Sequence, residues 1–452
     1  MHPHAFSPHR ALLASVVAAL LVTAVACAPP QPPVPRVTTI TIDTLKRPVR
    51  STEIVPRNTP FWTAIANLEL AGLDRQAMTG DERRFRDAMA MILEGDAQSA
   101  EVLLSSLYAA ASDSLIRYRS RIALSGVLYA QEKWEELATL PRDPRVYDTG
   151  LGPDRATIES WADFFRRLPT TGMRFDLQPS IVPLSRTALG TPLVPVSVNG
   201  RPRLFWLDTG SSFTMLSSDV AMMAGVTPLA DDTLEIVTTT GRVTARPAVI
   251  DSLRLGAVLF THHPSMIVDA ALLKLTVPGA PGESQVLAID GIIGFDAIRR
   301  MDVEIDYGHD RVTLRAPGRR AGPSERNLFW IGYPVVRLRS PSGRAVHFGL
   351  DTGADETFAT RTILEKVRAP RLIKDERRVE GIGGAFTVRV EMIPETRLAL
   401  GTHVVRFRNL IVLPPRRTTF VNLDGVLGTN AWTGAKVRID MTNGRVEIEA
   451  AR

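Results

Sequence analysis

The pattern of apolar and polar residues changes character along the chain. Between residues 58 and 168, apolar residues recur three and four positions apart, as at Phe85, Ala88 and Met89, and this spacing predicts amphipathic helices. From Pro192 onward, short alternating runs are separated by Gly, Pro and Asn-Gly pairs, which predicts strands joined by tight turns. The chain is therefore expected to be multidomain, with an N-terminal all-α module followed by an all-β region.

The helical stretch divides into pairs of helices. Gly95-Asp96 interrupts the first run, and Gln131-Glu132 interrupts a later one. Helix pairs joined by short turns resemble tetratricopeptide (TPR) hairpins. Residues 58–168 are thus expected to form a TPR-like helical-hairpin domain, with a last helix from Asp154 to Leu168. Two interpretations remain open, namely a surface that docks a protein partner and a small domain packed on the rest of the chain. Residues 169–190 contain three prolines and are expected to be a linker.

The N-terminus carries the pattern of a secretory signal. Arg10 precedes the apolar run Ala11–Val22, and small residues then lead to Cys27, which is typical of signal peptides. The run is shorter than the roughly 20 residues that span a membrane. Residues 1–27 resemble a bacterial lipoprotein signal in which Cys27 is lipidated; an ordinary cleaved signal with an incidental cysteine is the alternative. The protein is expected to be secreted across the inner membrane and lipid-anchored to the cell envelope in the periplasm, with the Pro-rich residues 28–57 as an extended linker.

Two apolar strands are each predicted to deliver an acid into a tight turn. Asp208-Thr209-Gly210 follows one strand, and Asp351-Thr352-Gly353 follows another. Later segments repeat in the same order, with Ile292-Ile293-Gly294 and Val426-Leu427-Gly428 each followed by a hairpin. Removing a carboxylate from water is costly. A repeated arrangement of this kind therefore indicates that the two carboxylates meet.

The two Asp-Thr-Gly turns and their downstream glycine motifs resemble those of the aspartic proteases. More narrowly, they resemble a bacterial retropepsin-like protein that carries both lobes in one chain. The resemblance implies an all-β, two-lobed acid-protease-like domain, with lobes at residues 191–317 and 327–452 and an inter-lobe linker at 318–326. It also implies a polypeptide substrate, no cofactor and no metal. In the family, hydroxyl hydrogen bonds from residues matching Thr209 and Thr352 cross-link the two turns.

Paired carboxylates can supply both the base and the acid of peptide hydrolysis. Like charges held close together cannot both ionise, so a pair shares one proton, as aspartic-protease dyads do. The ionised member takes a proton from water, and the protonated member polarises the scissile carbonyl. We therefore expect Asp208 and Asp351 to be the catalytic pair of an aspartic endopeptidase, with the shared proton belonging to the pair. The alternatives are a non-catalytic peptide- or protein-binding scaffold on the same fold, and an enzyme that cuts only itself or one dedicated partner.

The residues beside the two acids are expected to support them. Gly210 and Gly353 permit the tight turns and the close approach of a substrate. Ser211 could donate a hydrogen bond to its carboxylate, whereas Ala354 in the second copy could not. Because such a donor lowers the first apparent pKa of the pair, we expect an acidic to mildly acidic pH optimum.

Two glycine-containing segments are expected to form flaps that cover the cleft. Thr240 and Gly241 lie in the first lobe, and Gly381, Ile382, Gly383 and Gly384 lie at a similar offset in the second. The second segment resembles the glycine-rich flap tip of retroviral proteases, and two flaps favour the retropepsin-like arrangement. A phosphate-binding loop is excluded there, because a strand and not a helix is predicted to follow.

Charge and cysteine content bear on several other functions. The net charge of +6 comes from scattered arginines without a basic block interleaved with aromatic residues, so nucleic acid is not expected as a partner. Cys27 is the single cysteine of the sequence, which excludes an intramolecular disulfide. His262 and His263 are adjacent and would face opposite ways on a strand, so a metal site is not expected there. Asp296 and Asp355 are interpreted as turn residues or modulators.

Overall fold

The described part of the chain begins after the signal sequence and the Pro-rich linker. The computed structural model describes residues 59–141, 161–231, 233–238, 241–278, 283–318, 326–368, 371–413 and 421–450. The chain divides into two units, Met1–Thr39 and Ile40–Arg452, and all described residues lie in the second. The predicted signal with Cys27 therefore lies outside the described residues. Within the described part, no helix is long and apolar enough to cross a membrane.

The first described segment is a helical module. Its helices are α1 (Pro60–Ala66), the 3₁₀ helix η2 (Leu70–Arg75), α2 (Gly80–Glu94), α3 (Ala97–Ala110), α4 (Ser114–Ala130) and α5 (Trp134–Thr139). Residues 161–165 are also helical. Thr79 and Glu82 form a capping box at the start of α2, and Gly95, with a φ of +75°, ends that helix. The Asp96 side chain then accepts from the backbone N–H of Ser99 and caps α3. The Gly95-Asp96 interruption is thus the turn between α2 and α3.

The first lobe is built on one nine-stranded sheet. Its strands are β1 (Gly172–Phe175), β3 (Ser185–Arg186), β4 (Pro192–Val198), β5 (Arg201–Leu207), β6 (Met215–Ser217), β7 (Leu234–Val237), β8 (Arg242–Leu255), β9 (Val258–Val268) and β12 (Gly291–Ile293). They are ordered β1-β9-β6-β12-β5-β4-β8-β7, with β3 on β4. Strands β10 (Lys274–Pro278) and β11 (Ser284–Ala288) pair separately, and the short helices are α8 (Ser218–Met223), η3 (Ala270–Leu273) and α9 (Phe295–Ile298). Strand β5 runs parallel to β12, with Leu207 opposite Ile293.

The second lobe repeats the central features of the first. Its sheet contains β15 (Leu328–Trp330), β16 (Pro334–Arg339), β17 (Ala345–Leu350), β18 (Phe358–Thr360), β19 (Ile373–Gly381), β20 (Gly384–Leu400), β21 (His403–Leu413) and β22 (Gly425–Leu427), and its 3₁₀ helices are η4 (Arg361–Glu365) and η5 (Thr429–Ala431). Strand β17 runs parallel to β22, with Leu350 opposite Leu427, as β5 does to β12. The predicted fold class, helices followed by a two-lobed all-β region, is confirmed.

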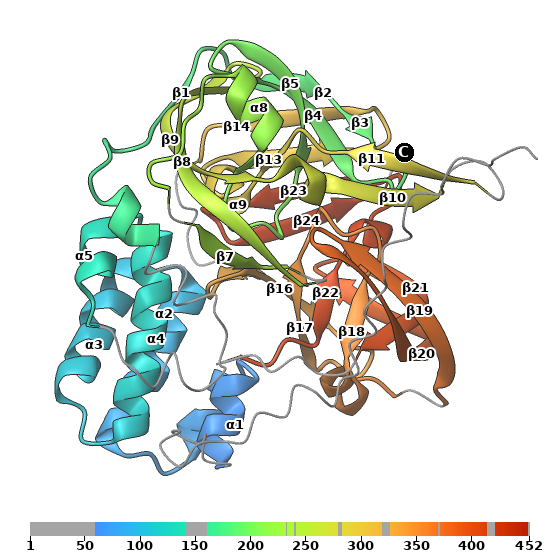
Figure 1. The fold of residues 1–452 in the computed structure, drawn as a ribbon. Coiled ribbons are helices and arrows are strands. Elements are labelled where there is room, and N and C mark those ends of the chain that lie inside the picture. Colours follow the sequence, from blue (N-terminus) through green and yellow to red (C-terminus); the bar gives the residue numbers. More distant parts are fainter. Residues whose placement is uncertain are drawn as a thin grey trace, which may run out of the picture. The chain divides into compact units, whose positions relative to one another are not determined.

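A five-stranded sheet joins the two lobes. Its order is β2 (Ser180–Pro183), β14 (Arg311–Arg315), β13 (Asp302–Asp306), β23 (Lys436–Asp440) and β24 (Arg445–Glu449). Figure 1 shows β13 and β23 side by side, where the yellow strands of the first lobe meet the red strands of the second. The Arg438 guanidinium donates two hydrogen bonds to the Asp302 carboxylate across this seam, at 2.9 and 2.7 Å. The sheet and this bidentate pair fix the register between the lobes.

The segment expected to be a linker, residues 169–190, instead supplies strands to both sheets. It contributes β1, which pairs with β9, β2, which pairs with β14, and β3, which pairs with β4. The prolines were a misleading signal. Pro183 is the last residue of β2, an edge strand, where proline is tolerated, and Pro179 comes directly before that strand. The first lobe therefore begins before residue 191.

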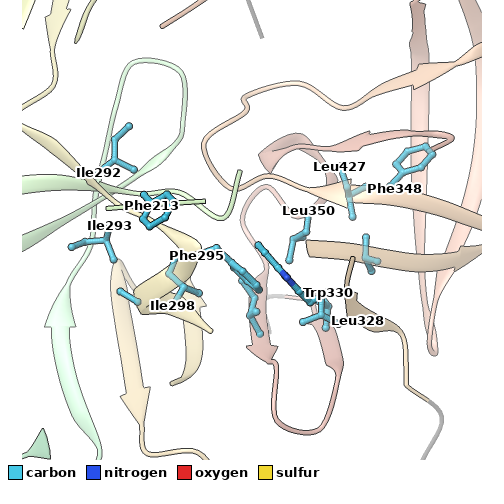
Figure 2. Packing of buried hydrophobic residues seen from close by; sticks show 14 of the residues in the cluster. Phe213, Ile292, Ile293, Phe295, Ile298, Leu328, Trp330, Phe348, Leu350 and Leu427 are labelled. Carbon is cyan, nitrogen blue, oxygen red and sulfur yellow. The ribbon is translucent and has the colours of Figure 1, made fainter. Parts of the chain in front are cut away.

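An aromatic cluster, formed by Tyr129, Trp134, Phe213, Phe295 and Trp330, joins the helical module to both lobes. The Tyr129 ring lies 5.6 Å from Trp330 and is nearly parallel to it, and it meets Phe213 edge-on at 5.4 Å. Trp330 also stacks on Phe295 of the first lobe at 5.4 Å. Figure 2 shows this contact, with Ile293 on one side and Leu350 on the other. The helices thus share a core with the β region.

Candidate active site

Two equivalent strands, β5 and β17, lead directly into Asp208 and Asp351. The last three residues of β5 are buried, as are the last five of β17. The backbone N–H of Asp208 donates to the carbonyl of Ile293 at 3.0 Å, and that of Asp351 donates to the carbonyl of Leu427 at 3.1 Å. The downstream apolar-apolar-glycine strands therefore hold each acid from behind, as their repeated order along the sequence suggests.

The two carboxyl groups face each other across the pseudo-symmetric pair of turns. A Cβ placed on Gly210 would lie 2.5 Å from Cγ of Asp351, and one placed on Gly353 would lie 2.5 Å from Cγ of Asp208. The two carboxyls also act on each other, because each is among the causes of the other's pKa shift. Each glycine is required because a side chain there would displace the opposite acid. The structure thus brings together the two residues expected to be catalytic.

The threonines of the two turns are cross-linked. Thr209 Oγ1 donates to the carbonyl of Leu350 at 2.8 Å, and Thr352 Oγ1 donates to the carbonyl of Leu207 at 2.7 Å. Each hydroxyl also accepts from the backbone N–H of the other threonine, at 3.0 Å in both cases. Both side chains are fully buried. Four reciprocal hydrogen bonds therefore lock the turns against each other.

Backbone amides surround the carboxylates. The N–H of Gly210 donates to Asp208 Oδ1 at 2.7 Å, and the N–H groups of Gly353 and Ala354 both donate to Asp351 Oδ1 at 3.0 Å. The prediction that the Ser211 hydroxyl donates a hydrogen bond to Asp208 is wrong. That hydroxyl donates to the carbonyl of Phe213 at 2.7 Å, because it closes its own turn, and it is the backbone N–H of Ser211 that lowers the pKa of Asp208.

Both acids hold a proton more tightly than an ordinary aspartate does. Burial raises the pKa of Asp208 above its ordinary value, with backbone hydrogen bonds from Gly210 and other residues opposing this. Burial raises the pKa of Asp351 further, and the charge of Asp208 and the hydrogen bond with it add to the rise. A pair with these properties ionises once before it ionises twice, and between the two steps the two carboxyls share one proton.

Tyr333, which belongs to neither Asp-Thr-Gly motif, also reaches the pair. Its hydroxyl lies 3.5 Å from Asp351 Oδ2. A Cβ on Gly349 would lie 2.5 Å from the Tyr333 ring, so glycine is needed there. A glycine inside a predicted strand marks a close approach. Gly349, two residues before Asp351, is the sequence signal that could have revealed this contact.

The expected flap segments lie at the tips of two hairpins. Strands β7 and β8 form one, and β19 and β20 form the other, with Gly381 paired to Gly384 at its tip. A Cβ on Gly241 would lie 3.8 Å from the carbonyl oxygen of Gly383. The two tips therefore approach each other, and Ile382 packs against the apolar core. Thr240 lies outside the described residues. The hairpin geometry also excludes a phosphate-binding loop, which needs a helix after the glycines.

The adjacent histidines and the extra acids have other surroundings. His263 is buried, and its Nε2 lies 3.1 Å from both Asp296 Oδ2 and Thr214 Oγ1. Asp296 also accepts from the backbone N–H of Thr214 at 3.1 Å, so it supports the turn after the first acid. Burial raises the pKa of Asp355. Among the described residues, no group of three or more His, Cys, Asp or Glu is placed to hold a metal.

Both lobes of the β region also match a model of a known protein family. An aspartyl protease family model matches the chain twice, over residues 194–297 and 336–431. Each match falls in one lobe and contains one Asp-Thr-Gly turn with its downstream glycine strand. No curated protein matches the chain. The β region is therefore aspartyl-protease-like in both lobes, and that family acts on polypeptides.

Proposed function

We propose that the protein is an aspartic-type endopeptidase in which Asp208 and Asp351 activate water. The observation that carries the proposal is the approach of the two carboxyls, with each opposing glycine Cβ position 2.5 Å from a carboxyl carbon. The cross-linked threonines hold this approach rigidly, and positioning of this kind is worth large factors in rate. The two family matches support the same conclusion.

The two carboxyls can act as base and acid in turn. In our proposal the ionised member, written here as Asp208, accepts a proton from the attacking water, while the protonated member, Asp351, donates its proton to the scissile carbonyl oxygen. The water oxygen bonds to the carbonyl carbon and forms a tetrahedral diol. As the diol collapses, the carbon–nitrogen bond breaks, Asp208 gives its proton to the nitrogen, and Asp351 regains a proton from the diol. The pair returns to its starting state, because each proton that leaves is replaced.

The flap hairpins would complete the site around a bound peptide. Gly241 and Gly383 approach each other at the hairpin tips, and glycine allows the backbone to come close to a substrate. An extended peptide held beneath them would be shielded from bulk water, which strengthens electrostatic interactions with the pair.

The role of the helical module follows from its contacts. The aromatic cluster buries Tyr129 and Trp330 against each other, and Arg299 of the first lobe donates to the Glu132 carboxylate at 2.9 Å. These contacts favour the interpretation of a domain packed on the protease-like lobes. Docking of a protein partner on the other faces of the module remains part of the proposal. So does a periplasmic location with a lipid anchor at Cys27.

Cleavage of a mixed peptide library by the purified protein tests the proposal. We expect internal cleavage by the wild-type protein and a loss of about 10²-fold or more in the Asp208→Asn variant, since a general base typically contributes that much. Peptide binding without cleavage would support the scaffold alternative. Cleavage that survives Asp208→Asn would overturn the assignment.

A further inference from the structure

Tyr333 occupies a special place beside the acid pair. It lies between β15 and β16, and its hydroxyl approaches Asp351 Oδ2 at 3.5 Å from a partly buried position. Hydrogen bonds in substrate-free sites are often long and tighten when the site is occupied. The ring fits because residue 349 of β17 is glycine, where a Cβ would lie 2.5 Å from the ring.

The first lobe has no such arrangement at the matching position. Trp206 lies two residues before Asp208, as Gly349 lies two residues before Asp351. The Trp206 indole N–H donates to the hydroxyl of Thr191, and Trp206 is buried within its own lobe. The two halves therefore share backbone and threonine contacts but differ at this position. The Tyr333 hydroxyl adjoins Asp351, one acid of the pair.

The hydroxyl of Tyr333 stays protonated over the working pH range of an acid pair. Burial raises its pKa well above the ordinary value, and the charges of Asp351 and Asp208 raise it further. Among the described residues, these two carboxyls are the charged groups that act on Tyr333, and Asp208 is the charged group that acts on Asp351. Asp355 and Glu356 follow in the same loop, and burial raises the pKa of each.

We propose that Tyr333 is a positioning residue that donates a hydrogen bond to the Asp351 carboxyl and so orients it within the pair. The donated bond orients the Asp351 carboxyl and stabilises its ionised form, which sets the upper pH limit at which Asp351 still carries its proton. The catalytic consequence rests on the proposed endopeptidase function, while the hydrogen bond itself does not.

Two measurements on Tyr333→Phe test this inference. The first is the pH dependence of kcat and KM on a cleaved peptide. We expect the alkaline limb to move up by about 0.5–1 pH unit, and kcat to fall with KM nearly unchanged, because one hydrogen bond to a charged group is lost. The second is a carbon-13 NMR titration of aspartate carboxyls in the substrate-free protein, in which Asp351→Asn identifies the Asp351 signal and separates it from Asp355. The same upward shift is expected there.

Two further variants serve as controls. Tyr307→Phe removes a buried hydroxyl after β13, where the pKa is raised to about 12 by burial and responds to Trp432 and Arg186 instead of the acid pair. It should leave both measurements unchanged. Gly349→Ala should displace the Tyr333 ring and reproduce the Tyr333→Phe shift, and combining the two should add little.

The outcomes separate the two proposals. If wild-type protein cleaves no peptide, the endopeptidase proposal fails, but the NMR titration still decides the role of Tyr333. A raised KM with an unchanged Asp351 titration in Tyr333→Phe would make Tyr333 a substrate contact and overturn the inference. A lowered melting temperature, with the pH–rate profile and the NMR titration both unchanged, would also overturn the inference. Tyr333 would then have a structural role only.

Discussion

The Tyr129 hydroxyl, at the end of α4, donates a hydrogen bond of 2.8 Å to the carbonyl of Ser212, two residues beyond Gly210. The helical module thus contacts the loop that carries the first acid. Tyr129 is also buried between Phe213 and Trp330. The helices therefore support the first turn as well as adding a surface to the chain.

This contact predicts a graded response to substitution. Tyr129→Phe keeps the ring and leaves the Ser212 carbonyl unpaired, which should lower the free energy of unfolding by about 1–2 kcal/mol. Tyr129→Ala also removes a buried ring and should cost about 3–5 kcal/mol. Urea unfolding measures both. Tyr108→Phe, on the half-buried part of α3, is the control and should change little; equal effects at positions 108 and 129 would refute the supporting role.

The threonine cross-links predict a difference between removing a hydroxyl and removing a methyl group. Thr352→Val leaves the carbonyl of Leu207 and the N–H of Thr209 without their partners, and should lower the free energy of unfolding by about 2–4 kcal/mol. Thr352→Ser keeps the hydroxyl and should retain most of both stability and peptidase activity. Thermal unfolding and peptide cleavage, measured on the same preparations, compare the Thr352→Val and Thr352→Ser variants. Wild-type activity in the valine variant would show that the cross-links are dispensable.

The close approach of the turns predicts that Gly210 tolerates no side chain. In Gly210→Ala the new Cβ would lie 2.5 Å from the Asp351 carboxyl, so the acid must move, and misplacement of about 1 Å can cost roughly 10²-fold in rate. Gly126→Ala in α4 is the matched control, because nothing lies within 4 Å of its Cβ position. That variant should be about 0.5–1 kcal/mol more stable, since alanine favours helix. Initial cleavage rates and melting temperatures distinguish the two.

The raised pKa of Asp351 predicts how stability depends on pH. A carboxyl whose folded pKa lies above its unfolded value of about 3.9 stabilises the fold fully below that value and loses this contribution as pH rises through the folded pKa. Asparagine at position 351 does not titrate, so its contribution to stability does not change with pH in this way. The stability of Asp351→Asn relative to wild type should therefore increase from pH 4 toward neutral pH, by about 1.4 kcal/mol for each unit of pKa shift.

Urea unfolding of Asp351→Asn and wild type at a series of pH values measures this difference. The exposed Asp231 provides a control variant, Asp231→Asn, for which no comparable trend is expected. A difference between Asp351→Asn and wild type that is constant with pH would mean that Asp351 is not held in its protonated form.

Much of the fold could be predicted because periodicity and repetition are local signals. The Gly95-Asp96 turn, the two Asp-Thr-Gly turns and their downstream glycine strands all follow from short stretches of sequence. The pairing of Asp208 with Asp351 could be expected because burying a carboxylate costs free energy, and the sequence places an acid at the end of a buried strand twice. The order of helices and lobes follows from the change in hydrophobic period.

What could not be predicted depends on contacts between distant segments. The identity of Ser211 does not show whether its hydroxyl donates to Asp208 or to the carbonyl of Phe213. The geometry of the turn determines which acceptor it reaches. The strands within residues 169–190 form on sheet edges that exist only once the lobes have folded. Tyr333 reaches Asp351 because Gly349 leaves room, and Tyr129 reaches Ser212 from a different domain. No spacing rule connects such pairs.

The central claim is that Asp208 and Asp351 act as one unit. Its most direct test is the rate of peptide cleavage, kcat/KM, in Asp208→Asn, Asp351→Asn and the double variant, with folding checked by circular dichroism. Residues that act as a unit lose function non-additively, so we expect each single variant to fall by about 10²–10⁴-fold and the double variant to fall no further. Losses that multiply in the double variant, or cleavage that persists in either single variant, would contradict a shared-proton pair.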